Sequence, residues 1–173
     1  PVKAVNEFST DVSVTYKIED SGKTQVTHEV ILENNFSTLY ATSYTLILEN
    51  IDAQNLRAYS AEGIAYSLEQ AKEGDKLTVK VNFSDSVVGK GAKRHFNLSY
   101  DNGSFATHTG EVWEISIPKL AEESTFRNYN VKLMIPSSFG DEAYVSPGPK
   151  TTGTGEGYKI YSFEKRDVAE TGI

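Results

Sequence analysis

The sequence predicts an all-β fold, an antiparallel β-sandwich of about ten or eleven strands with little helix. Apolar residues alternate with polar ones in most segments, as they do in strands that turn one face to a core. Gly, Asp, Asn and Pro separate these segments at short intervals, which is typical of turns. The stretch 119–127 has room for a short helix, and no other segment shows a helical period.

The first half of the chain contains six candidate strands. In the clearest of them, Leu77, Val79, Val81 and Phe83 share one face, and Lys, Thr and Asn residues take the other. Such alternation is typical of antiparallel sheets with one buried face. In chain order, the six segments read DVSVTYKI, VTHEVIL, SYTLILEN, NLRAYS, GIAYSLE and KLTVKVNF.

The second half continues the pattern. Trp113 alternates with Ile115 and Ile117, so it is interpreted as a core residue in preference to a sugar-stacking platform. The segments here read RHFNLSY, GEVWEISIP, NYNVKLMIP, AYVS and YKIYSF. The predicted core consists of Val14, Tyr16, Val30, Leu46, Leu77, Val79, Val81, Phe96, Leu98, Trp113, Ile115, Val131 and Leu133.

The domain organisation is expected to be simple. Residues 1–173 are predicted to form a single β-rich domain, and the initial proline and polar end suggest a fragment of a longer chain. A possible boundary near 119–128 would divide the chain into two packed β subdomains. The sequence leaves open whether one sandwich or two subdomains are present. The segment 146–159 is rich in Gly, Pro and Thr and is predicted to be a flexible loop.

The composition argues against several classes of partner. The net charge is −7 and the acidic residues are spread along the chain, so no nucleic-acid partner is expected. The absence of cysteine excludes disulfides, thiolate zinc sites and a cysteine nucleophile in this sequence. No stretch approaches the ~20 apolar residues of a membrane-spanning helix, so no membrane span is expected in this segment.

The stretch VVGKGAKRHFNLSY, at 87–100, has the glycines and lysine of a phosphate-binding loop but not their order. That loop needs Gly-Lys followed by Ser or Thr and then a helix, whereas Gly91 and Ala92 are followed here by an alternating strand. We therefore predict that 87–93 is a hairpin connection between two antiparallel strands, with Phe83 and Phe96 on their buried side.

No catalytic, cofactor-binding or metal-binding residue is predicted. His28-Glu29 lacks the second histidine of a zinc-binding helix, and the local period is that of a strand. His95 is expected to point outward and His108 to lie in a loop. The candidate surface contacts are three tyrosines that fall outside the clearest core positions, Tyr40, Tyr59 and Tyr66.

Four stretches together resemble a known family: LYATSYTLILEN, VVGKGAKRHFNLSY, GEVWEISIPKL and IPSSFG. They are similar to the N-terminal non-catalytic β-domain of bacterial transglutaminase-like envelope proteins, over about Phe8 to Phe163. In that family a papain-fold domain follows, with the catalytic cysteine, histidine and aspartate, and the β-region is usually extracytoplasmic. A weaker similarity of shape is to the saddle-like β-domains of zinc aminopeptidases and of ribophorin-type proteins.

The resemblance implies two hypotheses about function. In the first, the chain is a non-catalytic accessory β-domain of an exported transglutaminase-like protein, and it positions or covers a downstream domain of the same chain. In the second, it is an extracytoplasmic binding module for a carbohydrate or an envelope protein, which it contacts through exposed aromatic residues or a sheet edge.

Overall fold

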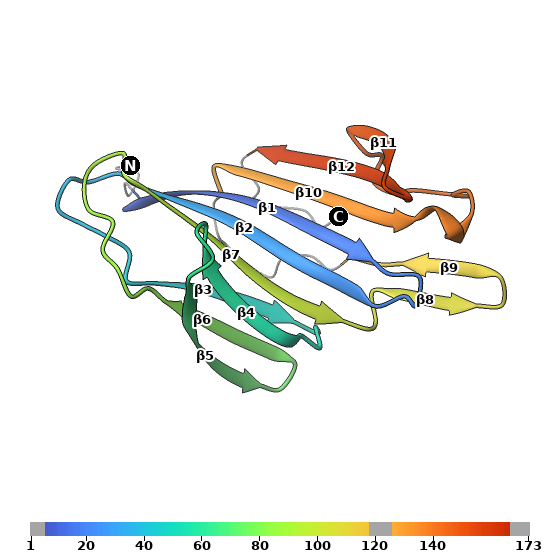
Figure 1. The fold of residues 1–173 in the computed structure, drawn as a ribbon, viewed down its shortest axis with the longest axis horizontal. Coiled ribbons are helices and arrows are strands. Elements are labelled where there is room, and N and C mark those ends of the chain that lie inside the picture. Colours follow the sequence, from blue (N-terminus) through green and yellow to red (C-terminus); the bar gives the residue numbers. More distant parts are fainter. Residues whose placement is uncertain (1–5, 118–125, 167–173) are drawn as a thin grey trace, which may run out of the picture.

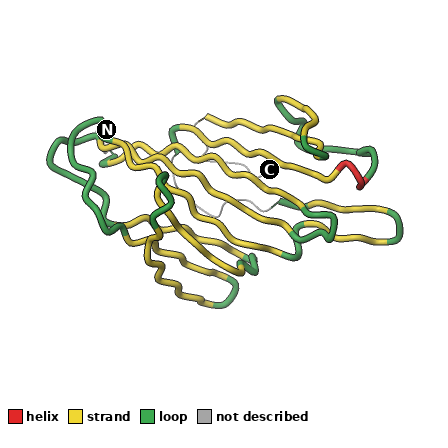
Figure 2. Tube along the Cα trace, in the orientation of Figure 1, coloured by secondary structure: helices red, strands yellow, loops and turns green. Residues whose placement is uncertain are grey.

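The structure is a computed structural model that describes residues 6–117 and 126–166. The described residues form twelve strands and one short 3-10 helix, η1 (Figures 1 and 2). The predicted all-β, sandwich-like fold with little helix is confirmed. The elements are β1 (Phe8–Ile18), β2 (Thr24–Asn34), β3 (Ser43–Glu49), β4 (Gln54–Ser60), β5 (Ala65–Glu73), β6 (Lys76–Asn82), β7 (Lys93–Asn102), β8 (Ala106–Thr109), β9 (Val112–Ile115), β10 (Asn128–Pro136), η1 (Ser137–Phe139), β11 (Thr151–Gly155) and β12 (Tyr158–Arg166).

Ten of these strands form one open sheet in the order β11-β12-β10-β1-β2-β7-β4-β5-β6-β3, and β8 pairs with β9 in a separate ribbon. All pairs are antiparallel except β1 with β10, which run parallel in register from Asp11 opposite Asn128. The predicted antiparallel sheet is thus wrong at this one pair. Alternation reports which face a side chain takes, but it carries no information about the direction of a distant partner strand.

The sheet bends into two layers between β4 and β5. These two strands share only two residue pairs near their turn, and β5 then pairs with β6, which carries β3 on its other side. Tyr44 of β3 and Phe83, just after β6, contact the Phe96 ring of β7 edge to face, with ring centroids 5.3 and 5.1 Å apart. The layer of β3, β5 and β6 therefore packs against the inner face of the larger layer, in the manner of a sandwich.

The core lies between these layers and contains most of the residues that the sequence predicts to be buried. Ten of the thirteen are buried, and Leu77, Trp113 and Ile115 are partly buried. Trp113 lies on the short β8–β9 ribbon at one end of the molecule, where it stacks on Phe139 of η1 with ring centroids 4.0 Å apart. A ribbon of four-residue strands cannot reach the centre of the sandwich, so its apolar face packs at the rim of the core.

Two predictions about the C-terminal region are wrong. The segment AYVS, 143–146, forms no strand, since Pro147 and Pro149 follow directly and cannot donate to a ladder. The predicted flexible loop 146–159 instead contains β11 and the first residues of β12. Glu156 and Gly157, with φ angles of 53° and 82°, make the two-residue turn that joins them. Two positive φ angles at this position are typical of a type I′ hairpin, and threonine favours strands.

The predicted hairpin at 87–93 is also wrong. β6 and β7 do not pair with each other, because β6 belongs to the smaller layer and β7 to the larger. The segment between them crosses from one layer to the other, and the Phe83–Phe96 contact is made across the core.

The proposed subdomain break near 119–128 lies mostly outside the described residues. Within the described ranges, no helix has the length and apolar character to cross a membrane.

Candidate interaction surface

Two loops meet at the end of the molecule where β2 ends and β7 begins (Figure 1). They are 35–42, between β2 and β3, and 83–92, between β6 and β7. The side-chain amide of Asn34 donates to the carbonyl of Leu39 at 2.9 Å and to that of Val87 at 2.8 Å. The backbone of Asn34 also exchanges hydrogen bonds with Gly91 and Ala92, at 2.8 and 3.0 Å. One buried asparagine therefore fixes both loops against each other.

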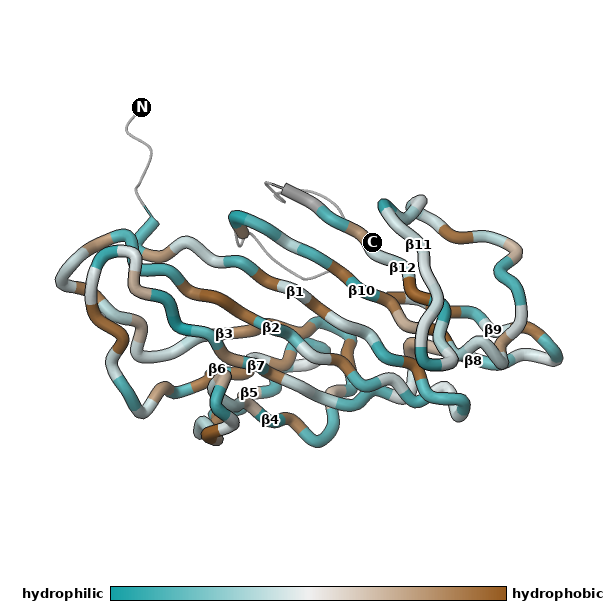
Figure 3. Tube along the Cα trace, turned by 45° about the horizontal axis from the view of Figure 1, so that its top comes forward, coloured by the Kyte–Doolittle hydropathy of each residue, from teal (hydrophilic) through white to brown (hydrophobic). Residues whose placement is uncertain are grey.

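Apolar side chains are exposed on both loops. Phe36, Leu39, Tyr40 and Val88 keep 40%, 37%, 42% and 55% of their surface accessible. We call these four residues the loop end. Figure 3 shows hydrophobic stretches on both loops at this end of the molecule. Several large apolar side chains exposed together, in place of isolated ones, are typical of an interaction site.

The charges beneath the loop end are paired with each other. Arg94 is buried on β7, and its guanidinium lies 4.1 Å from the centre of the Phe83 ring. It pairs with Asp85 at 2.7 Å and donates to the Tyr66 hydroxyl at 3.2 Å. The hydrogen bond from Arg94 holds the pKa of Asp85 below its usual value, so this carboxylate stays ionised. The second loop is therefore also held by an ion pair in which Arg94 is buried and Asp85 is exposed.

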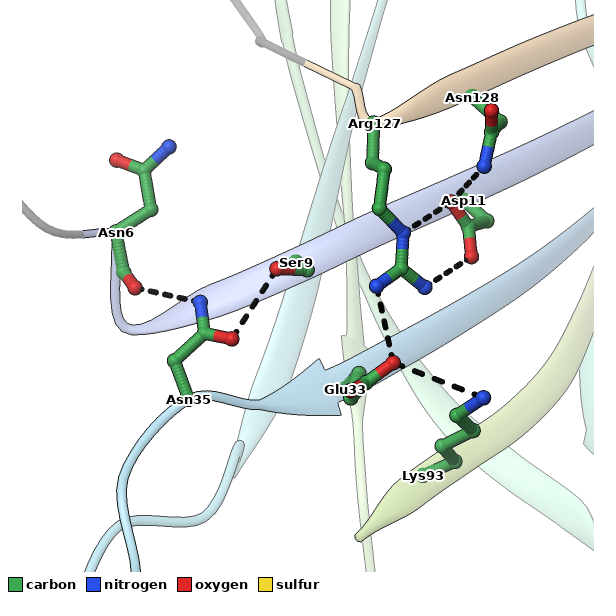
Figure 4. A network of polar contacts seen from close by, with 8 residues as sticks. All are labelled: Asn6, Ser9, Asp11, Glu33, Asn35, Lys93, Arg127 and Asn128. Atoms are coloured by element: carbon green, nitrogen blue, oxygen red, sulfur yellow. Dashed lines mark hydrogen bonds and ion pairs between the residues drawn. The ribbon is translucent and has the colours of Figure 1, made fainter. Parts of the chain in front are cut away.

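A larger polar network joins four strands on the outer face of the sheet close to this end (Figure 4). Arg127 pairs with Asp11 of β1, with a nitrogen–oxygen distance of 2.9 Å, and with Glu33 of β2 at 3.0 Å. Lys93 of β7 also pairs with Glu33, and the Asn128 amide donates to Asp11 at 2.8 Å. The hydrogen bond from Arg127 is the main cause of the lowered pKa of Asp11. The network ties the start of β10 to β1, β2 and β7.

The three candidate tyrosines do not come together. Tyr40 lies in the loop end and is exposed, whereas Tyr59 on β4 and Tyr66 on β5 are partly buried. Tyr59 pairs with Ala65, the residue before Tyr66, so the two side chains point to opposite faces of their hairpin. The Tyr66 hydroxyl is already engaged by Arg94. Their role in surface contact stays a prediction, for which Tyr40 has the most accessible position.

The three histidines do not come together in a common site either. His28 is buried on the inner face of β2 and stacks on Tyr100, with ring centroids 5.9 Å apart. Its burial lowers the pKa to about 4, so the ring is neutral, and its Nε2 has no hydrogen-bond partner among the described residues. His95 points outward as predicted and contacts Glu29 at 2.8 Å. His108 lies on β8 and not in a loop as predicted, and it stacks on Trp113. In residues 6–117 and 126–166, no three His, Cys, Asp or Glu side chains cluster as metal ligands would.

An open cavity of about 550 Å³ lies at the other end of β3 and β6 from the two loops. Its lining combines apolar side chains with carboxylate, amide and ammonium groups. The backbone N–H of Asn50, a residue with a φ of 56°, donates to the Asp75 carbonyl at 2.8 Å. The lining residues are Asn50, Ile51, Asp52, Ala53, Gln70, Lys72, Asp75 and Leu77.

Removing the Asn34 amide is expected to loosen both loops. Asn34→Ala should lower the free energy of unfolding by about 1–3 kcal/mol, because it leaves two carbonyls in a partly buried place without donors. Urea unfolding of Asn34→Ala and of Asn130→Ala, an exposed asparagine on β10, provides the measurement. Equal midpoints for the two variants would show that the loops do not depend on Asn34.

Gly89 and Gly91 in the second loop are expected to contribute to the stability of the fold. Lys90, which lies between them, is not expected to contribute. Gly89 and Gly91 have φ angles of 119° and 79°, which side chains with a branched Cβ avoid. Gly91→Val should cost about 1–2 kcal/mol or more, whereas Lys90→Ala, at an exposed position, should stay within about 0.5 kcal/mol. Titration of the parent chain with ATP should give no thermal shift. A shift that disappears in Lys90→Ala would establish a phosphate site here.

The comparisons with known proteins concern the fold. No family model matches the sequence, and no curated protein matches it. The structure is similar to a solved "putative protease" from Parabacteroides distasonis over 98% of this chain and 37% of that one, with a TM-score of 0.52 and 13% identity. An M1 zinc metallopeptidase from Deinococcus radiodurans matches over 94% of this chain and 38% of its own, with a TM-score of 0.48 and 13% identity.

The similarity to the first of these structures shows the fold alone. The chain is a β-domain of a kind that also occurs as one part of a larger solved chain, since it spans 37% of the first structure's length. The expected resemblance to a β-domain therefore holds at the level of the fold. The similarities do not show the link to transglutaminase-like proteins.

Proposed function

We propose that this chain is a non-catalytic accessory β-domain that positions or covers an adjoining domain of the same polypeptide. The observation that carries the proposal is the extent of the fold match. Nearly the whole chain is matched, and it accounts for 37% of the solved chain. The remainder of such a polypeptide has room for a separate domain.

We further propose that the adjoining domain is transglutaminase-like and that the protein is exported, with the β-domain outside the cytoplasm. The support is the resemblance of the four sequence stretches. A papain-type cysteine, histidine and aspartate would then belong to the adjoining domain. Fractionation of the producing cells, with an antibody to this domain, tests the location. Recovery with cytoplasmic markers would contradict export.

The accessory role is tested with the full polypeptide and a version that lacks residues 1–173. The β-domain alone should turn over no peptide, ester or glycan substrate. Removing it should lower the solubility or activity of the remainder, and adding it back as a separate chain should restore part of the loss. A remainder that behaves identically with and without the β-domain would contradict the proposal.

A second candidate function is a binding module for carbohydrate or an envelope protein. The exposed aromatic rings of Phe36 and Tyr40 favour it, since such rings supply much of the binding energy at recognition sites. A glycan array and a cell-wall pull-down with the parent and Tyr40→Ala distinguish this function from the first. Saturable binding that Tyr40→Ala weakens would support the binding module, and no binding by the parent chain would dismiss it.

A further inference from the structure

The described chain begins at the loop end, and its last strand, β12, ends near the level of the start of β1. The Asn35 side chain donates to the Asn6 carbonyl at 2.7 Å, and the Asn35 amide to the Glu7 carbonyl at 3.0 Å, so the first described residues lie against loop 35–42. β12 ends at Arg166, opposite Asn128, the first residue of β10. Asn128 lies opposite Asp11 of the parallel strand β1, so Arg166 is level with Asp11 and two strands away from β1.

The loop end also has the composition of an interface centre. Its four exposed residues are aromatic or aliphatic, and the nearby charges of Arg94 and Lys93 are matched by Asp85 and Glu33. Lys90 lies at the rim and is exposed. An apolar, charge-depleted centre with a polar rim is what distinguishes protein interfaces from the remaining surface.

The geometry of the loop end is fixed before any partner binds. Asn34 joins the two loops through its side chain and backbone, and Arg94 holds the second loop through Asp85. A surface that is already ordered loses little conformational entropy on association. Flexible loops with exposed apolar residues would lose more, so preorganisation favours a docking function over a simple connection.

We propose that the loop end, Phe36, Leu39, Tyr40 and Val88, is the docking surface for the adjoining domain of the same polypeptide. This inference rests on the accessory function proposed above. Asn6 lies beside this surface, and Arg166 is level with Asp11 two strands away, so both described ends are on the side of the sheet nearer to the loop end. Tethering raises the effective concentration of the second domain, so a patch of modest area is enough for stable docking.

The test uses the full polypeptide with a protease site placed in the connection between the β-domain and the rest. After cleavage, gel filtration and calorimetry report whether the two pieces stay together. The test variant combines Phe36→Ser, Tyr40→Ser and Val88→Ser. The control combines Val112→Ser and Tyr144→Ser, which replace side chains 68% and 83% exposed elsewhere. Hydrogen exchange in β1, β2 and β7 verifies that each variant retains the parent's core.

The parent pieces are expected to remain associated, the test variant to weaken the association at least tenfold, and the control to leave it unchanged. Parent-like association of the test variant would overturn the docking surface and leave the accessory function standing. Parent pieces that separate after cleavage would overturn the positioning role itself, and with it this inference. Self-association of the full polypeptide that only the test variant loses would assign the loop end to a second copy and overturn the proposal.

Discussion

Replacing Val79 with Asp is expected to remove most of the stability of this domain. Val79 is fully buried on β6, on the face that packs against the larger layer. An aspartate there would have to be buried either as a carboxylate without a cationic partner or in its protonated form. Both alternatives cost free energy. The loss should reach about 4 kcal/mol or more, a large share of the ~5–15 kcal/mol that a domain has in total.

The matched control for this change is Thr45→Asp. Thr45 is exposed on β3, directly opposite Lys80 of β6, so a new carboxylate there remains solvated beside a lysine. Its effect should stay within about 0.5 kcal/mol. Urea unfolding monitored by circular dichroism measures both variants. Val79→Asp with the midpoint of the parent would show that the inner face of β6 is assigned wrongly.

The domain is expected to lose stability as the pH falls from neutral towards 4, with His28 as a main cause. In the unfolded chain the histidine takes up a proton near pH 6.5, whereas burial keeps it neutral in the fold until about pH 4. Between these values the unfolded state binds more protons, so acid favours unfolding. The difference of about 2.5 pH units corresponds to about 3 kcal/mol, present in full above pH 6.5 and lost by pH 4.

The variant His28→Leu separates this effect from that of the carboxylates. Asp11, Asp85 and Asp101 have lowered pKa values, so they too lose stabilising contacts in acid, at lower pH. Urea unfolding of the parent and of His28→Leu at several values between pH 4 and 7 gives the difference between the two curves. That difference should change by about 3 kcal/mol over the range. Parallel curves would mean that His28 titrates normally in the fold.

The candidate site was only partly predictable. Tyr40 was one of three tyrosines named as candidate surface contacts, and it is the one that the structure leaves exposed in the loop end. Phe36, Leu39 and Val88 were missed, since their exposure follows from the way loops 35–42 and 83–92 meet at Asn34. The signal for His28 was present, because a period of two puts it on the face of Val26 and Val30.

The sequence by itself determined most of the strands and which of their faces is buried, with β11 and the segment AYVS as exceptions. Alternation is a local property, and burial of one face requires it wherever a strand lies on a core. It therefore identified Val14, Val79 and Leu98 without knowledge of any partner strand. The Glu156-Gly157 turn is also a local feature. It was missed because the surrounding segment is rich in Gly, Pro and Thr, a composition that is typical of flexible loops.

Only the tertiary structure decided how the strands are arranged. The parallel β1–β10 pair joins residues more than a hundred positions apart, and β6 and β7 separate into different layers although they are consecutive. These choices depend on the total apolar area that each arrangement buries and on the twist of the whole sheet, which no short stretch encodes. The loop end exists for the same reason, because it forms only where two segments far apart in the chain are brought to one end of the sandwich.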